Sequence, residues 1–454
     1  MGIYTKFVAS LAFPLHERLK RHSTVAVKRQ LEETQWWSPA RIEALQVERL
    51  RELLTQAGGH VPYYSDLFRD IGFDPSQVQS LHDLQKLPLL TKPIIRANAE
   101  RLRHAHAGPL ARYSTGGSSG QPLQFDVGMD RVSHDVAAKW RATRWWDVDI
   151  GDPELVIWGS PIELGAQDRL RQWRDTLMRS SLLSAFEMTE QNLDDYALRI
   201  RALAPKMVFG YPYSIALIAA RAEQRGVRLD DLGIKVVFVT SEFLHDHQRE
   251  TISRVFGCPV ANGYGGRDAG FIAHECPAGG MHLTAEDLIV ELLDEAGQPV
   301  PMGQAGEVIV THLFSQDYPF IRYRTGDIAV LDERACSCGR GLPLLKEIQG
   351  RSNDFLLALD GRLLPCGAFT YLMREAEGIE SYKIIQETRT LTRLQLVRPA
   401  GLDDALRTRL VTGFRQRLGS ATQVEVELME TIPAQGNGKY RYVVSHVVGV
   451  TGNV

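Results

Sequence analysis

The feature that most narrows the possible folds is an alternation of short apolar runs with helical stretches between about residues 150 and 275. Residues 206–210 and 235–240 are typical of buried strands, and residues 215–225 between them predict a helix. A strand–helix–strand order predicts a parallel sheet covered by helices. Ligands of such sheets bind beyond the carboxyl ends of the strands, so we expect residues 210–213 and 240–242 to line a site.

The segments before and after this region differ in pattern. A helix-rich stretch reaches about residue 110, with an amphipathic helix predicted over residues 41–54 and a break at residues 60–64. Residues 287–292 and 306–311 predict antiparallel strands that are joined through a glycine-bearing turn.

A small α+β unit is predicted at the carboxyl end, with strands at 392–397 and 424–428 around a helix at 403–418. A chain of 454 residues is too long for a single core. The predicted fold class is α/β: a large N-terminal domain with mixed, largely parallel, covered sheets and a small mobile α+β lid domain. The predicted divisions are a helix-rich segment 1–110, a core 111–349 and a lid 350–454.

Composition excludes several classes of protein. A net charge of -3 argues against a general nucleic-acid binder, and no apolar run approaches the roughly 18 residues that span a bilayer. The apolar residues 8–15 are too short for a signal peptide and predict an N-terminal helix. Five cysteines, an odd number, suit a reducing compartment, so we expect a cytoplasmic protein.

The loop at residues 262–270 presents a tyrosine, an arginine and a carboxylate among glycines. Tyr264 can stack on a planar base, Arg267 can pair with phosphate oxygens, and Asp268 can hold Mg²⁺. A tight turn with a solvated Arg–Asp pair explains this loop equally well.

A second loop, residues 113–122, is dense in glycine and hydroxyl residues. Its backbone N–H groups and hydroxyls can surround phosphate oxygens, although it lacks the spacing and the lysine of a Walker A loop. A flexible linker is the alternative. The candidate phosphate-binding residues are Ser114, Thr115, Gly116, Gly117, Ser118, Ser119 and Gly120.

Two further residues have chemistry suited to a nucleotide. Asp327 follows a glycine and can accept both ribose hydroxyls, or it is an ordinary turn residue. Lys439 lies in the glycine-rich loop 433–441, which can move into an active site or be an exposed tail. Arg101, Arg103 and Arg112 form a loose basic cluster, either a solvated face or a phosphate or coenzyme contact.

Together these loops resemble the adenylate-forming (acyl-CoA synthetase-like) superfamily, and within it the phenylacetate-CoA ligase and capsule-biosynthesis (CapK-type) branch. Residues 61–64 and 87–92 share the resemblance. The resemblance implies that loop 114–120 holds the ATP phosphates and that Lys439 stabilises the adenylation transition state, with Arg267 and Asp268 beside it. It also implies a set of nucleotide-binding residues: Ser241, Glu242, Asn262, Tyr264, Gly265, Asp327 and Arg351.

Three residues depart from the family pattern. Gln121 stands where many relatives have lysine, Asp268 is shorter than the usual Mg²⁺-associated glutamate, and Asn353 stands where the hinge often carries Asp or Lys. The first two bear on the efficiency of adenylation, and the third bears on rotation of the lid.

Four residues form a possible metal site. Cys276 and His282 flank a Pro-Ala-Gly-Gly turn, and Cys336 and Cys338 follow later, which gives a Cys₃His set suited to structural Zn²⁺. Four unrelated residues are the alternative, with His274 as an alternative ligand. Cys258 and Cys366 are expected to be unliganded.

The sequence therefore predicts an ATP- and Mg²⁺-dependent ligase that adenylates a carboxylic acid and transfers the acyl group to a thiol of CoA or of an acyl carrier protein. Tyr211 and Tyr213 are candidates for an acyl pocket, although core packing explains them nearly as well. Adenylyl transfer to a hydroxyl, as in coenzyme F390 synthetases, and a non-catalytic nucleotide-binding relative are alternatives. The oligomeric state, including a homodimer, stays open.

Overall fold

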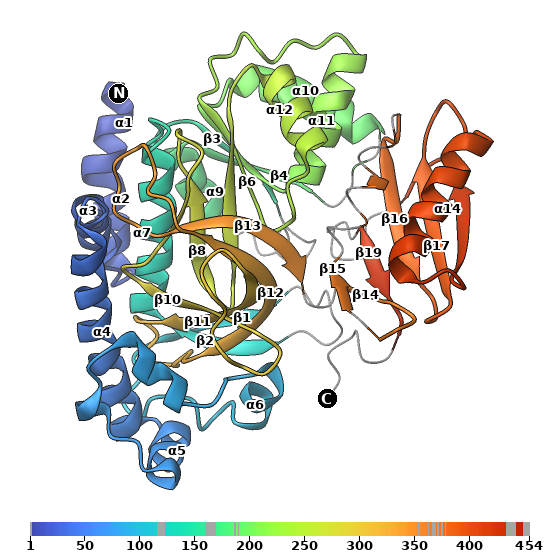
Figure 1. Ribbon diagram of the computed structural model, residues 1–454. Coiled ribbons are helices and arrows are strands. Elements are labelled where there is room, and N and C mark those ends of the chain that lie inside the picture. The colour runs from blue at the N-terminus through green and yellow to red at the C-terminus, as the bar shows by residue number, and fades with distance from the viewer. Residues whose placement is uncertain are drawn as a thin grey trace.

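The computed structural model describes residues 2–454 except 116–122, 159–168, 186–187, 189, 352–354, 362, 366–368, 370–371, 374–375, 377, 433–441 and 448–454. Two lobes are visible in Figure 1: a large lobe, residues 2–351, and a small lobe, residues 355–447. The amino-terminal part of the large lobe is helical. Its helices are α1 (Ile3–Phe7), the π-helix η1 (Val8–Ala12), α2 (Phe13–Leu19), α3 (Thr24–Thr34), α4 (Pro39–His60), α5 (Pro62–Ile71), the 3₁₀ turns η2 (Pro75–Gln77) and η3 (Leu81–Lys86), and α6 (Lys92–Ala97).

Within the described residues, an 11-stranded sheet runs through the large lobe in the order β10-β11-β12-β13-β9-β8-β7-β6-β5-β3-β4. The half from β4 to β7 is parallel, and the half from β7 to β10 is antiparallel. The strands are β3 (Glu154–Trp158), β4 (Ser180–Ser184), β5 (Met207–Gly210), β6 (Val236–Thr240), β7 (Val260–Gly266), β8 (Gly270–Glu275), β9 (Met281–Leu283), β10 (Leu288–Leu293), β11 (Ala305–His312), β12 (Tyr323–Asp332) and β13 (Leu344–Arg351). Beside them, β1 (Leu110–Ser114) and β2 (Gln124–Gly128) form a separate hairpin.

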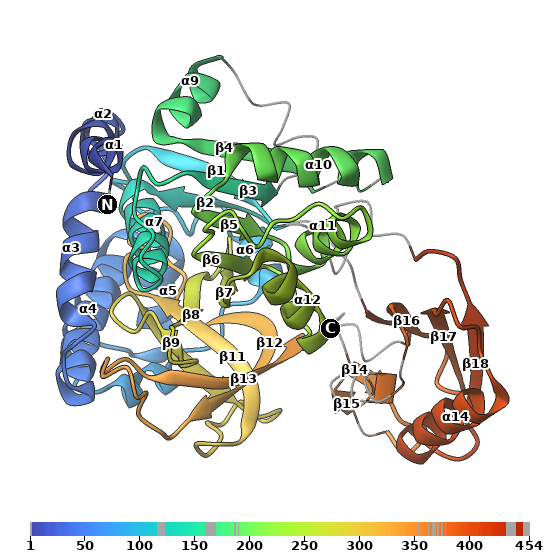
Figure 2. The ribbon, with the colours of Figure 1, turned by 90° about the horizontal axis from the view of Figure 1, so that it is seen from above.

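Side chains on the parallel strands alternate between two layers of helices. Val208 and Val237 pack with the helices α10 (Glu190–Leu203), α11 (Pro212–Gln224) and α12 (Asp246–Phe256) on one face. Phe209 and Phe238 pack with Ala142 of α7 (Met129–Arg144) on the other. Figure 2 shows these layers, with α9 (Arg169–Met178) at the edge. Burial on both faces explains why these strands are apolar throughout.

The small lobe has its own core. A 4-stranded sheet, ordered β18-β17-β16-β19, packs against one long helix, and Phe369 and Phe414 lie in the apolar layer between them. The elements are the hairpin β14 (Phe355–Leu357) and β15 (Leu363–Pro365), β16 (Ser381–Gln386), β17 (Leu391–Val397), α14 (Asp404–Leu418), β18 (Gln423–Leu428) and β19 (Val443–Ser445).

Most elements expected from the sequence are present. The helix predicted at 41–54 lies within α4, which ends at His60, and the strand–helix–strand unit is β5–α11–β6 with its two strands parallel. The predicted hairpin is β10–β11, with Gly297 at φ 76 in its connection. Some strands, among them β1 and β13, were not expected from the sequence. The divisions after residues 110 and 349 stay predictions.

Helix α7 buries ionisable side chains against the antiparallel half of the sheet. The guanidinium of Arg141 lies 2.6 Å from Glu286, and both side chains are fully buried. About two turns earlier, His134 Nδ1 lies 2.8 Å from Asp287. Burial raises the pKa of Glu286 even though Arg141 opposes the shift. A carboxylate held this way depends on its partner, because an unpaired buried charge is very costly.

We therefore expect Arg141→Met to lower the free energy of unfolding by about 3–5 kcal/mol, because it leaves Glu286 buried with the hydroxyl of Thr34 but without its cation. Urea unfolding would measure the change. The matched control is Arg334→Met, which removes an exposed guanidinium from Asp332 and should change stability little. Equal effects of the two substitutions would contradict this account of α7.

Candidate active site

The predicted site residues gather at the carboxyl ends of β5, β6 and β7. The sheet register places Gly210 beside Val239, and Val239 beside Asn262. The segments that follow these strands are therefore neighbours, and the backbone N–H of Tyr213 lies 3.4 Å from Glu242 Oε2. Burial raises the pKa of Tyr213.

Ser241 introduces the sharp change of direction after β6. Its φ of 70 lies in the left-handed region, which is unusual for a residue with a Cβ. Such a conformation costs about 1–3 kcal/mol and persists where the surrounding fold imposes it, commonly at functional sites. The strained turn precedes Glu242, which accepts from the backbone N–H of Tyr213 in the first turn of α11.

Tyr264 and Asp327 meet although 63 residues separate them. The Tyr264 hydroxyl donates to Asp327 Oδ2 at 2.8 Å. Asp327 lies opposite Arg351 in the β12–β13 pairing. The backbone of Arg351, another predicted nucleotide-binding residue, is therefore adjacent to Asp327. At Gly265, a Cβ would lie 2.3 Å from the Gly270 carbonyl, so only glycine allows β7 and β8 to approach this closely.

A buried arginine donates hydrogen bonds to the turn between β7 and β8. Arg131 on α7, 1 % exposed, donates through Nη2 to the carbonyls of Arg267 at 3.1 Å and Asp268 at 2.8 Å. The Tyr323 hydroxyl donates to Asp268 Oδ2 at 2.6 Å. These contacts fix both the backbone and the carboxylate of the turn.

Asp135, one turn along α7, completes the support of this turn. It lies 3.6 Å from His312 and accepts from the backbone N–H of Phe271. Burial raises the pKa of Asp135, but the neighbouring His312 and the charge of Arg131 outweigh it and hold the pKa below its ordinary value. An anionic Asp135 thus counterbalances Arg131 beneath the turn.

Sequence reasoning missed Arg131 and Tyr323. A usable signal was present: Arg131, His134 and Arg141 recur on one face of α7 beside the buried Ala138. Polar residues at inward-facing positions of a helix must have buried partners, so they indicate an interior network.

The base of the predicted phosphate loop is closed at Thr115. Its Oγ1 accepts from the backbone N–H of Leu123 at 2.9 Å, and its own N–H donates to the Leu123 carbonyl. Arg267 Nη1 donates to the Ser114 carbonyl at 3.3 Å, which joins this loop to the turn at Asp268.

Several predicted residues lie outside what the structure describes. They are Gly116, Gly117, Ser118, Ser119, Gly120, Gln121, Asn353, Cys366, Lys439 and the side chain of Arg351. Their assignments stay predictions.

The small lobe contacts the large lobe beside this edge. Tyr442 packs edge-on against His245, with ring centroids 4.2 Å apart, and its hydroxyl accepts from Gln248 Nε2 at 2.9 Å. His245 and Gln248 form the capping box at the start of α12, just after the Ser241 turn.

Two other sequence interpretations can be compared with the structure. Tyr211 is 6 % exposed and stacks on Trp158 with centroids 4.3 Å apart, and its assignment to an acyl pocket stays a prediction. In the basic cluster, Arg103 and Arg112 both pair with Asp126 at 2.6 Å, and Arg101 pairs with Asp66.

The four predicted metal ligands converge. The ligand atoms of Cys276, His282, Cys336 and Cys338 all lie within 4.8 Å of one another. The sulfurs of Cys276 and Cys336 are 3.6 Å apart, and Cys338 Sγ is 3.2 Å from His282 Nε2. His274, the alternative ligand, is instead stacked on Phe271.

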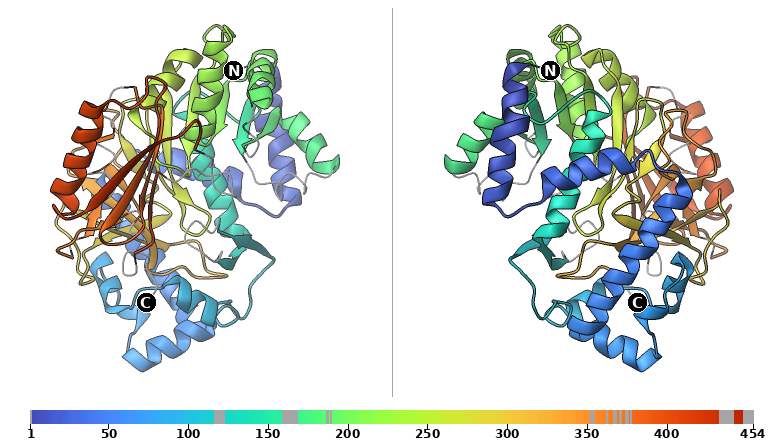
Figure 3. Two further views of the ribbon diagram at one scale, coloured as in Figure 1. Left: turned by 90° about the vertical axis from the view of Figure 1, so that its right-hand side faces the viewer. Right: turned by 90° about the vertical axis from the view of Figure 1, so that its left-hand side faces the viewer.

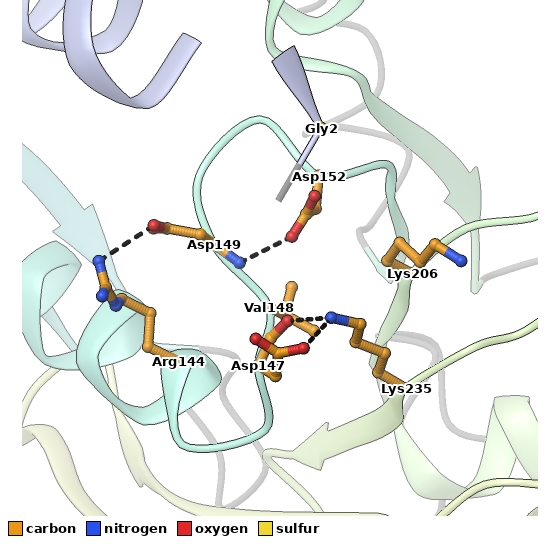
Figure 4. Close-up of a pocket in the computed structure, with 8 residues that line it drawn as sticks. All are labelled: Gly2, Arg144, Asp147, Val148, Asp149, Asp152, Lys206 and Lys235. Carbon is orange, nitrogen blue, oxygen red and sulfur yellow. Dashed lines mark hydrogen bonds and ion pairs between the residues drawn. The ribbon is translucent and has the colours of Figure 1, made fainter. Parts of the chain in front are cut away.

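A separate cavity of about 200 Å³ lies at the opposite edge of the sheet, where Lys206 and Lys235 precede β5 and β6. Figure 4 shows that its charged side chains pair with one another: Lys235 with Asp147, and Arg144 with Asp149. Its position and its internal pairing separate it from the candidate active site.

Comparison with known proteins identifies the relatives. Residues 356–446 match the family described as the CapK C-terminal domain. Protein CapK of Staphylococcus aureus is 23% identical over 407 residues, 89% of this chain and 89% of CapK. A phenylacetate-coenzyme A ligase of Thermus thermophilus is 24% identical over 364 residues, 76% of this chain and 78% of the ligase. The chain is a relative of CapK and of the phenylacetate-coenzyme A ligases.

The fold of this CapK relative is shared with an adenylate-forming CoA ligase. A crystal structure of 2-hydroxyisobutyryl-CoA ligase in the postadenylation state superposes with a TM-score of 0.73 at 20% identity, over 90% of each chain. The resemblance to this branch and the α/β fold class with its small C-terminal lobe are thereby confirmed.

If Arg131 holds the turn, Arg131→Met should accelerate amide hydrogen exchange at residues 267–271 by about tenfold or more, because each lost bond from a charged donor contributes about 1.5–3 kcal/mol. Exchange followed by mass spectrometry would measure this. Arg112→Met, which removes a half-exposed cation from Asp126, is the control and should leave the turn unchanged. Unaltered exchange in Arg131→Met would rule out this role.

Proposed function

We propose that the protein activates a carboxylic acid with ATP to form an acyl-adenylate and then transfers the acyl group to the thiol of CoA. The observation that carries the proposal is the junction of Tyr264, Asp327 and the Arg267–Asp268 turn at one edge of the sheet. The relatives named phenylacetate-coenzyme A ligase support it.

In the proposed binding mode, the ribose hydroxyls donate to Asp327, whose Oδ2 already accepts from Tyr264. The ring of Tyr264 lies against the nucleotide, and the phosphates extend toward Ser114 and Thr115. Arg267, tied to the Ser114 carbonyl, supplies positive charge to the phosphate oxygens. Mg²⁺ would be held by Asp268, whose remaining oxygen lone pairs are suited to a hard cation, and would neutralise phosphate charge.

The reaction then has two displacements. A carboxylate oxygen of the acid attacks the α-phosphorus, the bond to the bridging oxygen breaks, and pyrophosphate leaves. The thiolate of CoA attacks the acyl carbon, and AMP leaves with the bonding electrons. Lys439 is proposed to stabilise the negative charge that builds up at the α-phosphate in the first step.

The direct test is carboxylate-dependent ATP–pyrophosphate exchange across a panel of aryl and aliphatic acids. We expect exchange with one class of acid and a loss of about 10²–10³ in its rate for Lys439→Ala, the scale of removing one stabilising group from a transition state. Lys383→Ala, a lysine on β16 of the small lobe, is the matched control and should retain exchange.

Other outcomes would redirect the assignment. Exchange without acyl-CoA formation, together with a product heavier by one AMP, would favour a hydroxyl acceptor. ATP binding without exchange for any acid would favour a non-catalytic relative. An equal loss of exchange rate in Lys439→Ala and Lys383→Ala would contradict the proposed role of Lys439.

We also propose that Cys276, His282, Cys336 and Cys338 hold a structural Zn²⁺. In a tetrahedral site with Zn–S of about 2.3 Å, two sulfurs lie about 3.8 Å apart, close to the 3.6 Å between Cys276 and Cys336. At Gly280, a Cβ would lie 2.6 Å from the Cys336 sulfur, so the glycine leaves room for that thiolate. Four protein ligands leave no position for substrate. The ion would tie the β8–β9 turn to the connection between β12 and β13.

For this site we expect about one zinc per chain by elemental analysis, and loss of the metal with a lower Tm in Cys336→Ser. Cys258→Ser serves as the control, because Cys258 packs in the core behind α12 and should retain the metal. Purified protein free of zinc, with an unchanged Tm in Cys336→Ser, would disprove the assignment.

A further inference from the structure

The amino-terminal helix exposes an apolar stripe. The segments α1, η1 and α2 follow one another from Ile3 to Leu19 with helical backbone at each junction. Every fourth residue is a large exposed hydrophobic side chain: Ile3 (91%), Phe7 (45%), Leu11 (59%), Leu15 (56%) and Leu19 (78%). We call these five residues the outer stripe.

The π-helical segment keeps the outer stripe nearly straight. In an α-helix of 3.6 residues per turn, a step of four residues overshoots a full turn by about 40°. The wider turn of η1, between Val8 and Ala12, reduces that drift at the centre of the helix. One continuous surface is thereby displayed along the whole length.

The opposite side of this helix is already packed. Val8 and Phe13 lie in a core cluster with Ile150, and Thr5 donates to Asp152 at 2.9 Å. Glu17 is 4% exposed and accepts from Thr24. Because the inner side of the helix packs against the rest of the large lobe, the outer stripe cannot turn inward. The outer side of a surface helix is normally polar, so a contiguous apolar surface here indicates an interaction site.

The charge around the outer stripe is positive. Within residues 2–22 the acidic residue is Glu17, which is buried, whereas Lys6, Arg18, Lys20 and Arg21 are exposed. At the end near Ile3, the guanidinium of Arg179 lies 5.3 Å from the ring centroid of Tyr4. Basic residues therefore flank both ends of the apolar surface.

A neighbouring helix carries an exposed aromatic residue. Helix α9 packs beside η1, as Figures 2 and 3 show, and the Tyr4 hydroxyl donates to the Leu177 carbonyl at 2.9 Å. Trp173 on α9 is 77% exposed. Tryptophan is favoured where apolar and polar surroundings meet, as at a bilayer surface.

We propose that this face binds an anionic lipid surface, with the helix lying in the plane of the headgroups and the outer stripe reaching the acyl boundary. An apolar side with flanking lysine and arginine is the pattern of helices that bind membranes in this way. The described part of the chain contains no helix that could span a membrane.

Charge favours lipid over a second copy of the chain. A two-fold contact through the outer stripe would bring Lys6, Lys20 and Arg21 of one copy against basic residues of the other. No exposed acidic residue of this helix is available to offset that repulsion. Anionic headgroups supply the missing charge.

Co-sedimentation of the full chain with vesicles tests the proposal. Wild type should bind vesicles of phosphatidylcholine with phosphatidylglycerol, bind phosphatidylcholine alone more weakly, and release as salt rises. Leu11→Ser with Leu15→Ser should weaken binding by at least about tenfold, and Lys20→Glu with Arg21→Glu should remove the preference for anionic lipid.

The matched control is Leu198→Ser with Leu428→Ser, two exposed leucines on α10 and β18 outside the outer stripe, which should leave binding unchanged. Circular dichroism would establish that each variant is folded. The proposal is overturned if wild type stays in the supernatant with anionic vesicles, or if the control weakens binding as much as Leu11→Ser with Leu15→Ser. A wild-type dimer by light scattering that becomes monomeric in the stripe variant, without vesicle binding, would assign this face to self-association instead.

Discussion

The burial of charge along α7 is the constraint on which the rest of the structure depends. Arg131, His134 and Arg141 enter the interior on one face of the helix, and each pairs with a group there because burying a polar or charged side chain without a partner is costly. Arg141 pairs with Glu286 and His134 contacts Asp287, and both carboxylates lie on the segment before β10. Arg131 donates hydrogen bonds to two carbonyls of the β7–β8 turn. Helix α7 thus contacts both the antiparallel half of the sheet and the candidate active site, and it fixes their positions relative to each other.

Further buried contacts hold the backbone beside the candidate active site. Arg322, at φ 51, ion-pairs with Glu291 and donates to the Leu87 carbonyl, and Tyr323 follows it to reach Asp268. With Ser241, it is a second left-handed residue beside the candidate site, so the surrounding contacts impose unfavourable backbone at two positions there. The small lobe meets the large lobe here through the rings of Tyr382 and Tyr442, which both pack against His245, and through the bond of Tyr442 to Gln248.

The proposed lipid-binding face and the proposed active site lie at opposite edges of the sheet. The amino-terminal helix is attached through Asp152 and Arg179, which precede β3 and β4, whereas Tyr213, Ser241 and Asp327 surround the carboxyl ends of the parallel strands. Contact with a lipid surface through the outer stripe would therefore leave the site edge and the small lobe in water. Figure 1 shows this separation, with α1 and α2 at one side of the molecule and the small lobe at the other.

Local pattern by itself determined the βαβ unit, the β10–β11 hairpin, and β17, α14 and β18 of the small lobe, because apolar periodicity and turn residues act over a few neighbours. It also selected Tyr264, Asp268 and Asp327 and the four Cys and His residues as candidates. Only the tertiary structure decided which candidates meet, since the Tyr264–Asp327 bond and the metal cluster join residues about 60 positions apart. Arg131 was beyond local pattern for the same reason: its significance depends on carbonyl groups 136 and 137 residues away, and only the packed fold brings them within reach.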